Sequence, residues 1–210
     1  MMIALTLQKL KRSVLTASAR LIEAALAVAA VLGLGLMSSW YMVEAGTRLT
    51  TERVGPWVTW TSAAKPDADP YTRAHFAGSG TLAVSTDVQR TFVAKSDSDG
   101  ERLTSSCEYQ VAGKLPQADW WSIVVFDAGG MLISNPAGRH AFTSQTVAVA
   151  SNGAFTVTLA REARPGNWLP TRGAGRISIV LTVIEPRSGD GFARASDGGD
   201  LPTIGKIRCR

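Results

Sequence analysis

The chain has 210 residues, which is enough for one domain with a sizeable core plus an appendage. Its formal net charge is +5, yet residues 1–43 hold four basic side chains against one acidic, and residues 44–210 hold 18 against 16. Most of the excess charge therefore belongs to a short N-terminal segment. The remainder has no basic run with interleaved aromatic residues, which argues against a nucleic-acid-binding protein.

An uncharged apolar run from Ala24 to Val43 is the clearest feature of the N-terminal segment. As a helix it is long enough to cross a hydrocarbon layer of about 30 Å. Four basic residues precede it, so the positive-inside rule places the N-terminus in the cytoplasm and the rest outside. We therefore predict a cytoplasmic basic segment over residues 1–20 and a transmembrane helix over residues 21–43, in a bacterial inner membrane with the following domain in the periplasm.

A cleaved signal peptide is the alternative interpretation, because Val43-Glu44-Ala45 resembles a small-x-small cleavage site. The apolar run exceeds the usual length of a signal peptide's apolar h-region, roughly 7–15 residues, which favours a retained anchor. Within the helix, Ala25, Ala29 and Gly33 recur every four residues and predict a face on which another helix could pack closely. Alanine is common in such helices, so this spacing also arises by chance.

Residues 44–68 show little periodicity and are predicted to be a spacer between the membrane and a domain over residues 69–186. Asp69-Pro70 matches an N-cap followed by proline at the first helical position. A short helix over Tyr71–Ala77 would then end at the Gly78-Ser79-Gly80 breaker.

The signals that follow are those of strands. The run WWSIVVF is nearly continuous in apolar residues and predicts a strand buried on both faces. Asn152-Gly153 predicts a tight hairpin turn. Strands are predicted over Trp120–Phe126, Met131–Ser134, Thr146–Ala150, Phe155–Leu159 and Arg176–Glu185. Short strands separated by turn signals indicate a mainly β fold, either a β-sandwich or a jelly roll.

The two cysteines, Cys107 and Cys209, are predicted to form a disulfide, since cysteines of one exported domain often pair in an oxidising compartment. The bond would tie the tail, residues 187–210, back to the sheet. Two free thiols are the alternative.

The sequence contains no recognisable set of catalytic residues. His75 and His140 have no second histidine or cysteine at metal-ligand spacing, so no metal site is predicted. The stretch from Asp97 to Gly100 resembles part of a calcium loop, but the EF-hand register would put Lys95 at the first ligand position and Ser106 at the twelfth. We interpret it as a turn with solvated carboxylates, and predict no cofactor and no catalytic residue.

Six separated blocks nevertheless resemble one known family when taken in order. They are DPYTRA at 69–74, SDSDG at 96–100, CEYQVAG at 107–113, WWSIVVFDAGGMLISN at 120–135, GNWLP at 166–170 and LPTIGKIRC at 201–209. Together they resemble the domain-of-unknown-function 1214 family, in its short membrane-anchored bacterial form, over about residues 40–209.

The resemblance implies a β-rich, jelly-roll-like domain. It also implies an association with a companion protein of the domain-of-unknown-function 1254 family, because the two domains are often fused or encoded side by side. The family has no agreed mechanism, so it transfers no catalytic role. Positions in or next to the matching blocks form a candidate ligand or partner surface. They are Tyr71, Arg73, Asn135, Asn167 and Trp168 within the blocks, and Arg139 in the loop that follows Asn135.

Two functions are compatible with these observations. The first is a non-catalytic interaction module or accessory subunit of a membrane-associated assembly, with the lipid bilayer and another integral membrane protein as partners. The second is an envelope enzyme or a protein that binds a carbohydrate or another small molecule. The second would need a pocket where Trp168 or Tyr71 meets a charged side chain. For Trp168 itself, a packed loop anchor is favoured over a ligand-stacking face, because Leu169 and Pro170 flank it.

Overall fold

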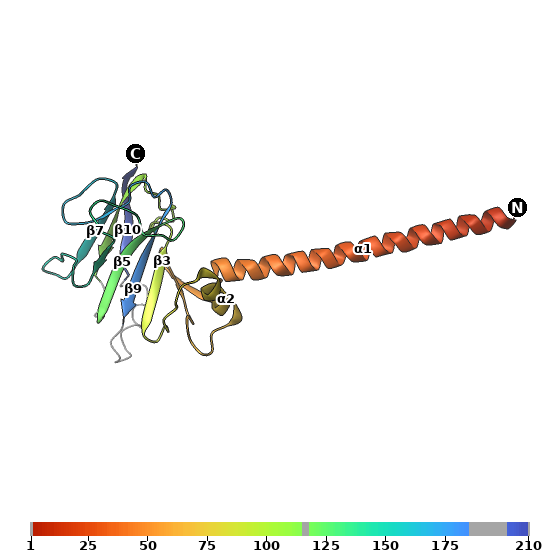
Figure 1. The fold of residues 1–210 in the computed structure, drawn as a ribbon, viewed down its shortest axis with the longest axis horizontal. Coiled ribbons are helices and arrows are strands. Elements are labelled where there is room, and N and C mark those ends of the chain that lie inside the picture. The colour runs from red at the N-terminus through yellow and green to blue at the C-terminus, as the bar shows by residue number, and fades with distance from the viewer. Residues whose placement is uncertain (1, 115–117, 185–200, 210) are drawn as a thin grey trace. The chain divides into compact units, whose positions relative to one another are not determined.

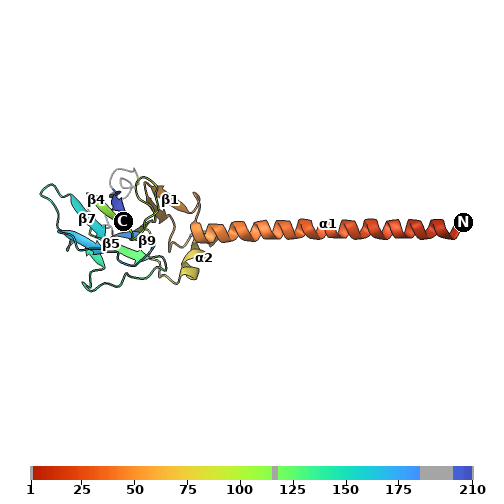
Figure 2. The ribbon, with the colours of Figure 1, turned by 90° about the horizontal axis from the view of Figure 1, so that it is seen from above.

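A computed structural model, drawn from two directions in Figures 1 and 2, describes residues 2–114, 118–184 and 201–209, with side chains from Ser18 onwards. The chain divides into two compact units, Met1–Gly46 and Thr47–Arg210. The first is helical and the second is built mainly of strands, so each is described by itself.

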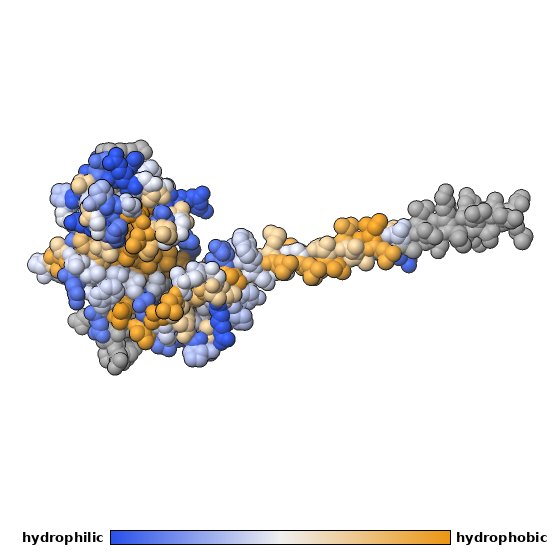
Figure 3. Space-filling model, in the orientation of Figure 1, coloured by the Kyte–Doolittle hydropathy of each residue, from blue (hydrophilic) through white to orange (hydrophobic). Residues whose placement is uncertain are grey.

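Helix α1 (Met2–Ala45) makes up almost all of the first unit. Its part from Ser18 to Ala45 is long and apolar enough to cross a membrane, and it contains the predicted span, although a signal sequence would pass the same test. The side chains along this part are exposed: Leu36 is 72% exposed, and Figure 3 shows the apolar surface along the helix. Such a surface is compatible with a membrane-spanning segment.

The second unit contains two sheets. The larger is antiparallel throughout, and its six strands lie in the order β1 (Thr51–Val54), β2 (Trp57–Trp60), β3 (Gln89–Ala94), β9 (Ile177–Ile184), β5 (Trp120–Asp127) and β6 (Ala141–Thr143). The smaller has the order β10 (Thr203–Cys209), β4 (Cys107–Gly113), β7 (Phe155–Ala160) and β8 (Asn167–Pro170), with β7 and β8 parallel.

The two sheets share one hydrophobic core, so the predicted mainly β, sandwich-like fold class is confirmed. Strand β9 shows the physical reason. Its residues alternate between buried and half-buried along all eight positions, which turns Ile179 and Leu181 into the core and leaves Ser178 and Val180 on the outer face. Strand β7 alternates in the same way over its first five residues in the opposite sheet.

The prediction of a spacer over residues 44–68 differs from the structure. Strands β1 and β2 form a hairpin there, and β2 joins the six-stranded sheet through β3. Trp57 on β2 is 1% exposed, and its indole Nε1 donates a 2.8 Å hydrogen bond to the carbonyl oxygen of Pro202. Pro202 in turn lies so close to Gly113 that a Cβ at that position would come within 2.9 Å of the proline Cα. Residues far apart in the sequence therefore close one end of the core.

The predicted hairpin around Asn152-Gly153 is only partly present. Strand β7 forms, but residues 146–150 contribute a single bridge between Val149 and Phe155 instead of a strand. The backbone of Ala148 pairs with the side chain of Asn167, and strand β8 occupies the edge of β7 that a hairpin partner would need. Because these backbone groups of Ala148 and β7 already have hydrogen-bond partners, a local hairpin is not needed to satisfy them.

The predicted strand over Met131–Ser134 is likewise reduced to one bridge, between Leu132 and Phe126. The Asp127 carboxylate accepts hydrogen bonds from the backbone of Gly129 and Met131 and so shapes a tight turn there.

Helix α2 (Pro70–Ser79) begins and ends close to the expected residues. The Asp69 carboxylate caps its N-terminus by accepting from the backbone of Tyr71 and Thr72 at 2.9 and 3.0 Å, and Gly80 ends it in the left-handed region. Burial raises the pKa of Asp69, but the hydrogen bonds from Thr72 and Tyr71 outweigh it and the pKa is lowered overall.

Candidate functional site

A groove of about 440 Å³ lies on the outer face of the six-stranded sheet. Its floor includes Thr91 and Val93 of β3 and Ser178 and Val180 of β9, the half-buried or exposed positions that alternate with core residues. Helix α2 and residues 81–86 form its walls. Its volume is within the range of small-molecule sites.

Three aromatic side chains form one side of the groove. Trp60, at the end of β2, stacks on His75 of α2 with ring centroids 4.3 Å apart, and the ring of Phe76 lies 6.0 Å from that of Trp60. The half-buried rings present an apolar surface toward a cavity.

Most polar side chains around the groove already have partners. Ser79 and Thr81 share a hydrogen bond between their hydroxyls, and the Thr86 hydroxyl donates to the carbonyl of Thr61 at 3.2 Å. The Gln89 amide donates to the hydroxyl of Thr91 at 3.3 Å. A ligand in the groove is therefore not required to satisfy these groups.

The groove has an uncharged lining. Among the eighteen described residues around it there is no Asp, Glu, Lys or Arg, and His75 is engaged with Trp60. Since an ionised group away from water needs a charged or hydrogen-bonding partner, this lining favours a neutral, apolar ligand.

None of the six residues of the predicted ligand surface lines the groove, but two of them, Arg139 and Trp168, lie close to each other. The amide of Asn135 shapes its own turn by donating to the carbonyls of Ile133 and Arg139, and its oxygen accepts from the Arg139 backbone at 3.0 Å. The Arg139 guanidinium then lies 6.0 Å from the Trp168 ring and 5.8 Å from the Phe142 ring. These distances permit a cation–π contact at the protein surface.

Trp168 and Asn167 lie on β8, and both have structural partners outside that strand. The Trp168 indole donates to the carbonyl of Ala160 at 3.0 Å and the ring is half-buried. Asn167 is buried and makes three hydrogen bonds to the backbone of Ala148 and Thr156, at 2.8, 2.8 and 2.9 Å. These contacts give both residues fixed positions in the fold, whatever else they bind.

Tyr71 and Arg73, the other two predicted surface residues, lie on α2. Tyr71 is half-buried, and Arg73 is exposed and donates to the carbonyl of Pro66 at 2.7 Å. Neither residue lines the groove, although the same helix forms one of its walls.

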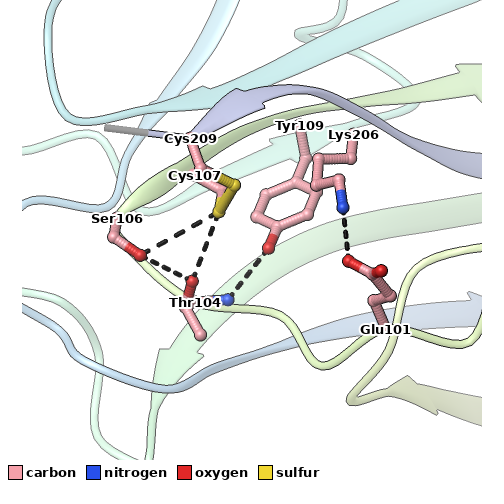
Figure 4. The surroundings of a disulfide bond; sticks show 7 residues. All are labelled: Glu101, Thr104, Ser106, Cys107, Tyr109, Lys206 and Cys209. Atoms are coloured by element: carbon pink, nitrogen blue, oxygen red, sulfur yellow. Dashed lines mark hydrogen bonds and ion pairs between the residues drawn. A yellow bond between two sulfur atoms is a disulfide. The ribbon is translucent and has the colours of Figure 1, made fainter.

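The predicted disulfide between Cys107 and Cys209 is confirmed, and Figure 4 shows its surroundings. The two cysteines are directly opposite each other on β4 and β10. Nearby, the Tyr109 hydroxyl accepts from the backbone of Thr104 at 3.1 Å, and Lys206 pairs with Glu101. The described end of the predicted tail is thus a strand of the smaller sheet, while residues 187–200 of that tail lie outside the described residues.

Glu108, next to the disulfide, is held between two arginines. Arg164 binds it with both ends of the guanidinium, at 2.5 and 3.1 Å, and Arg208 donates to it at 2.8 Å. These pairings, first of all the hydrogen bond from Arg164, lower the pKa of Glu108 from 4.5 to about 2. The ionised form is therefore stabilised by folding.

This pKa shift predicts an acid-sensitive contribution to stability. Because the folded pKa is depressed, the stabilisation is complete above about pH 4.5 and is lost as the pH falls toward 2. With allowance for solvent screening, we expect the loss to be about 2 kcal/mol. Urea unfolding of the full chain at pH 3 and pH 7 measures it. Glu108→Gln should reduce the difference by this amount, while the contribution of Asp69, whose pKa is also lowered, remains. An unchanged pH profile in this variant would contradict the assignment.

No cluster of three or more His, Cys, Asp or Glu suitable for a metal ion occurs within residues 2–114, 118–184 and 201–209. The calcium-like stretch forms a turn, as expected. However, Asp97 is 1% exposed, not solvated, and its Oδ1 accepts from the backbone of Asp99 and Glu101. The turn also contacts β10 through Ser98 and Ile204.

Sequence reasoning did not identify the groove residues. The available signals were Trp60, which stands three residues from the buried Trp57 and so on the opposite face of β2, and the adjacent His75 and Phe76 on a short helix. None of these patterns shows that α2 folds over the outer face of β3 and β9.

Comparisons with known proteins agree with the described fold. Residues 88–188 match the sequence model of the family "Protein of unknown function (DUF1214)". The crystal structure of the VPA0106 protein from Vibrio parahaemolyticus is similar with a TM-score of 0.54 and 17% identity, over 68% of this chain and 36% of that one. A crystal structure of an uncharacterized protein from Burkholderia cenocepacia has a TM-score of 0.40 and 16% sequence identity. That match covers 58% of this chain and 29% of the Burkholderia chain. No curated protein matches. The chain spans about a third of the length of each of these solved proteins, and its likeness to the Vibrio protein is one of fold.

Proposed function

We propose that this chain is a non-catalytic, membrane-anchored binding module. Residues 88–188 match the DUF1214 family, whose description assigns no activity, so the geometry of the chain supports the proposal. The observation that carries the proposal is the uncharged groove between α2 and the outer face of the six-stranded sheet. It combines a volume suited to a ligand with aromatic side chains and internally satisfied polar groups.

The proposed location is the bacterial inner membrane, with the N-terminus in the cytoplasm and the β-sandwich in the periplasm. Two features support it: the basic residues that precede the apolar part of α1, and the disulfide, which persists in oxidising compartments.

The binding module is proposed to serve as an accessory subunit of a membrane assembly. Ala25, Ala29 and Gly33 lie on the exposed surface of α1, where small residues allow another helix to approach. A companion of the domain-of-unknown-function 1254 family is the partner that the family resemblance suggests.

Site-specific photo-cross-linking in living cells tests whether the groove is the working surface. A photoreactive phenylalanine analogue would replace Leu82, a groove residue that is 96% exposed, or Val149, which is 58% exposed and does not line the groove. We expect a defined adduct at position 82 and none at position 149. Equal labelling of the two positions, or no adduct at position 82, would contradict the proposal.

A further inference from the structure

We infer that the groove accepts the hydrocarbon chain of a membrane lipid. This inference rests on the proposed function and names the ligand class of the same site. It follows from three observations: the chemistry of the lining, the short chain connection to the apolar helix, and an exposed leucine at the edge of the groove.

The lining matches a ligand that has neither charge nor a need for hydrogen bonds. The floor contributes Val93 and Val180, and Trp60 and Phe76 add aromatic surface. Lining residues with polar side chains, such as Thr86 and Gln89, bond to neighbours within the protein. A sugar or a peptide backbone would need several hydrogen-bond partners on a surface where most polar side chains are already engaged, whereas an alkyl or prenyl chain needs none.

The groove is within reach of the bilayer by chain length alone. The apolar helix ends at Ala45, and six residues later Thr51 is the direct ladder partner of Trp60, which belongs to the groove wall. An extended chain of six residues spans about 20 Å, and paired residues of neighbouring strands lie about 5 Å apart. The covalent connection therefore limits the separation between the end of the apolar helix and Trp60 to about 25 Å.

Leu82 supports an apolar occupant. It lines the groove and is 96% exposed, in a segment that also holds Val84 at 40% exposure. Burying a leucine side chain is favourable by the hydrophobic effect, so two apolar side chains at one rim favour a ligand that covers them. A hydrocarbon chain in the groove would do so.

The test uses the full chain in lipid nanodiscs that contain a phospholipid with a diazirine near the end of one acyl chain. After illumination, mass spectrometry locates the labelled peptides. Label on α1 is expected in every variant and serves as the internal standard. We expect additional label on the groove peptides that contain Trp60, Leu82 or Val180. A matched phospholipid with the diazirine on its headgroup should not label them.

Two variants and one control decide whether the label reports binding. Thr91→Trp fills the floor of the groove, and Ser178→Asp places a carboxylate on it. Each variant should lower the groove label relative to the α1 label about tenfold. A tenfold loss corresponds to about 1.4 kcal/mol of binding free energy. Thr158→Asp is the control, because Thr158 is also half-buried on an inner strand but in the smaller sheet. It should leave the groove label unchanged.

The outcomes separate this inference from the proposed function. Label confined to α1, or groove label that neither Thr91→Trp nor Ser178→Asp lowers, overturns the lipid assignment. If the adduct at position 82 in cells is then a protein, the binding module stands with a different occupant. If position 82 gives no adduct either, both proposals fail.

Discussion

Replacing Trp57 by alanine is expected to lower the free energy of unfolding of the β-sandwich by about 4 kcal/mol, as for other large core aromatic residues. Trp57 is 1% exposed, and its removal leaves a cavity between the two sheets. It also leaves the carbonyl of Pro202 without the indole donor. The change would therefore weaken the link between the N-terminal hairpin and the C-terminal strand.

Pulse proteolysis of the full chain in urea measures this loss, and Trp57→Phe separates its two causes. Phenylalanine retains most of the apolar contact but cannot donate a hydrogen bond, so we expect about 1–2 kcal/mol for this variant. Wild-type stability of Trp57→Ala would show that residues 51–60 are not integral to the sandwich, as the spacer interpretation held.

Breaking the disulfide is expected to cost about 3–5 kcal/mol. Cys107 and Cys209 are 102 residues apart in the sequence, so the bond restricts a very long loop of the unfolded chain. It also holds β10 at the edge of its sheet, where its only strand partner in the described structure is β4. Without the bond, the edge strand is expected to separate first.

Urea unfolding of the oxidised and reduced full chain, together with the Cys107→Ser/Cys209→Ser variant, measures this contribution. The reduced wild type and the double variant should have the same, lower stability, and reductant should have no further effect on the variant. Hydrogen exchange should show the largest loss of protection at β10. Equal stability of the oxidised and reduced wild type would contradict the expectation.

The family resemblance and the fold class followed from the sequence because they depend on patterns within short segments. Strand β9 carries its alternation in its own residues, and α2 carries its cap at Asp69 and its end at Gly80. The apolar length of α1 likewise depends on composition alone.

The strands that the sequence missed depend on partners far away in the chain. Strand β2 looks irregular by itself, and it becomes a strand because β3 accepts it as a neighbour and Trp57 reaches Pro202. The strand predicted over residues 146–150 does not form beside β7 for the converse reason. Strand β8 already pairs with β7, and the Asn167 side chain accepts the backbone hydrogen bond of Ala148. A local turn signal cannot show which edge of a strand is already occupied.

The sequence by itself determined an apolar helix, a β-rich domain and a pair of cysteines, because periodicity, capping and composition act over a few residues. Only the tertiary structure decided which face of the larger sheet stays open and that α2 folds beside it. The groove joins Trp60, His75 and Val180, which are up to 120 positions apart, and no sequence periodicity extends over such a separation. Contacts of this kind are selected by the packing of the whole domain, which decides where a ligand can bind.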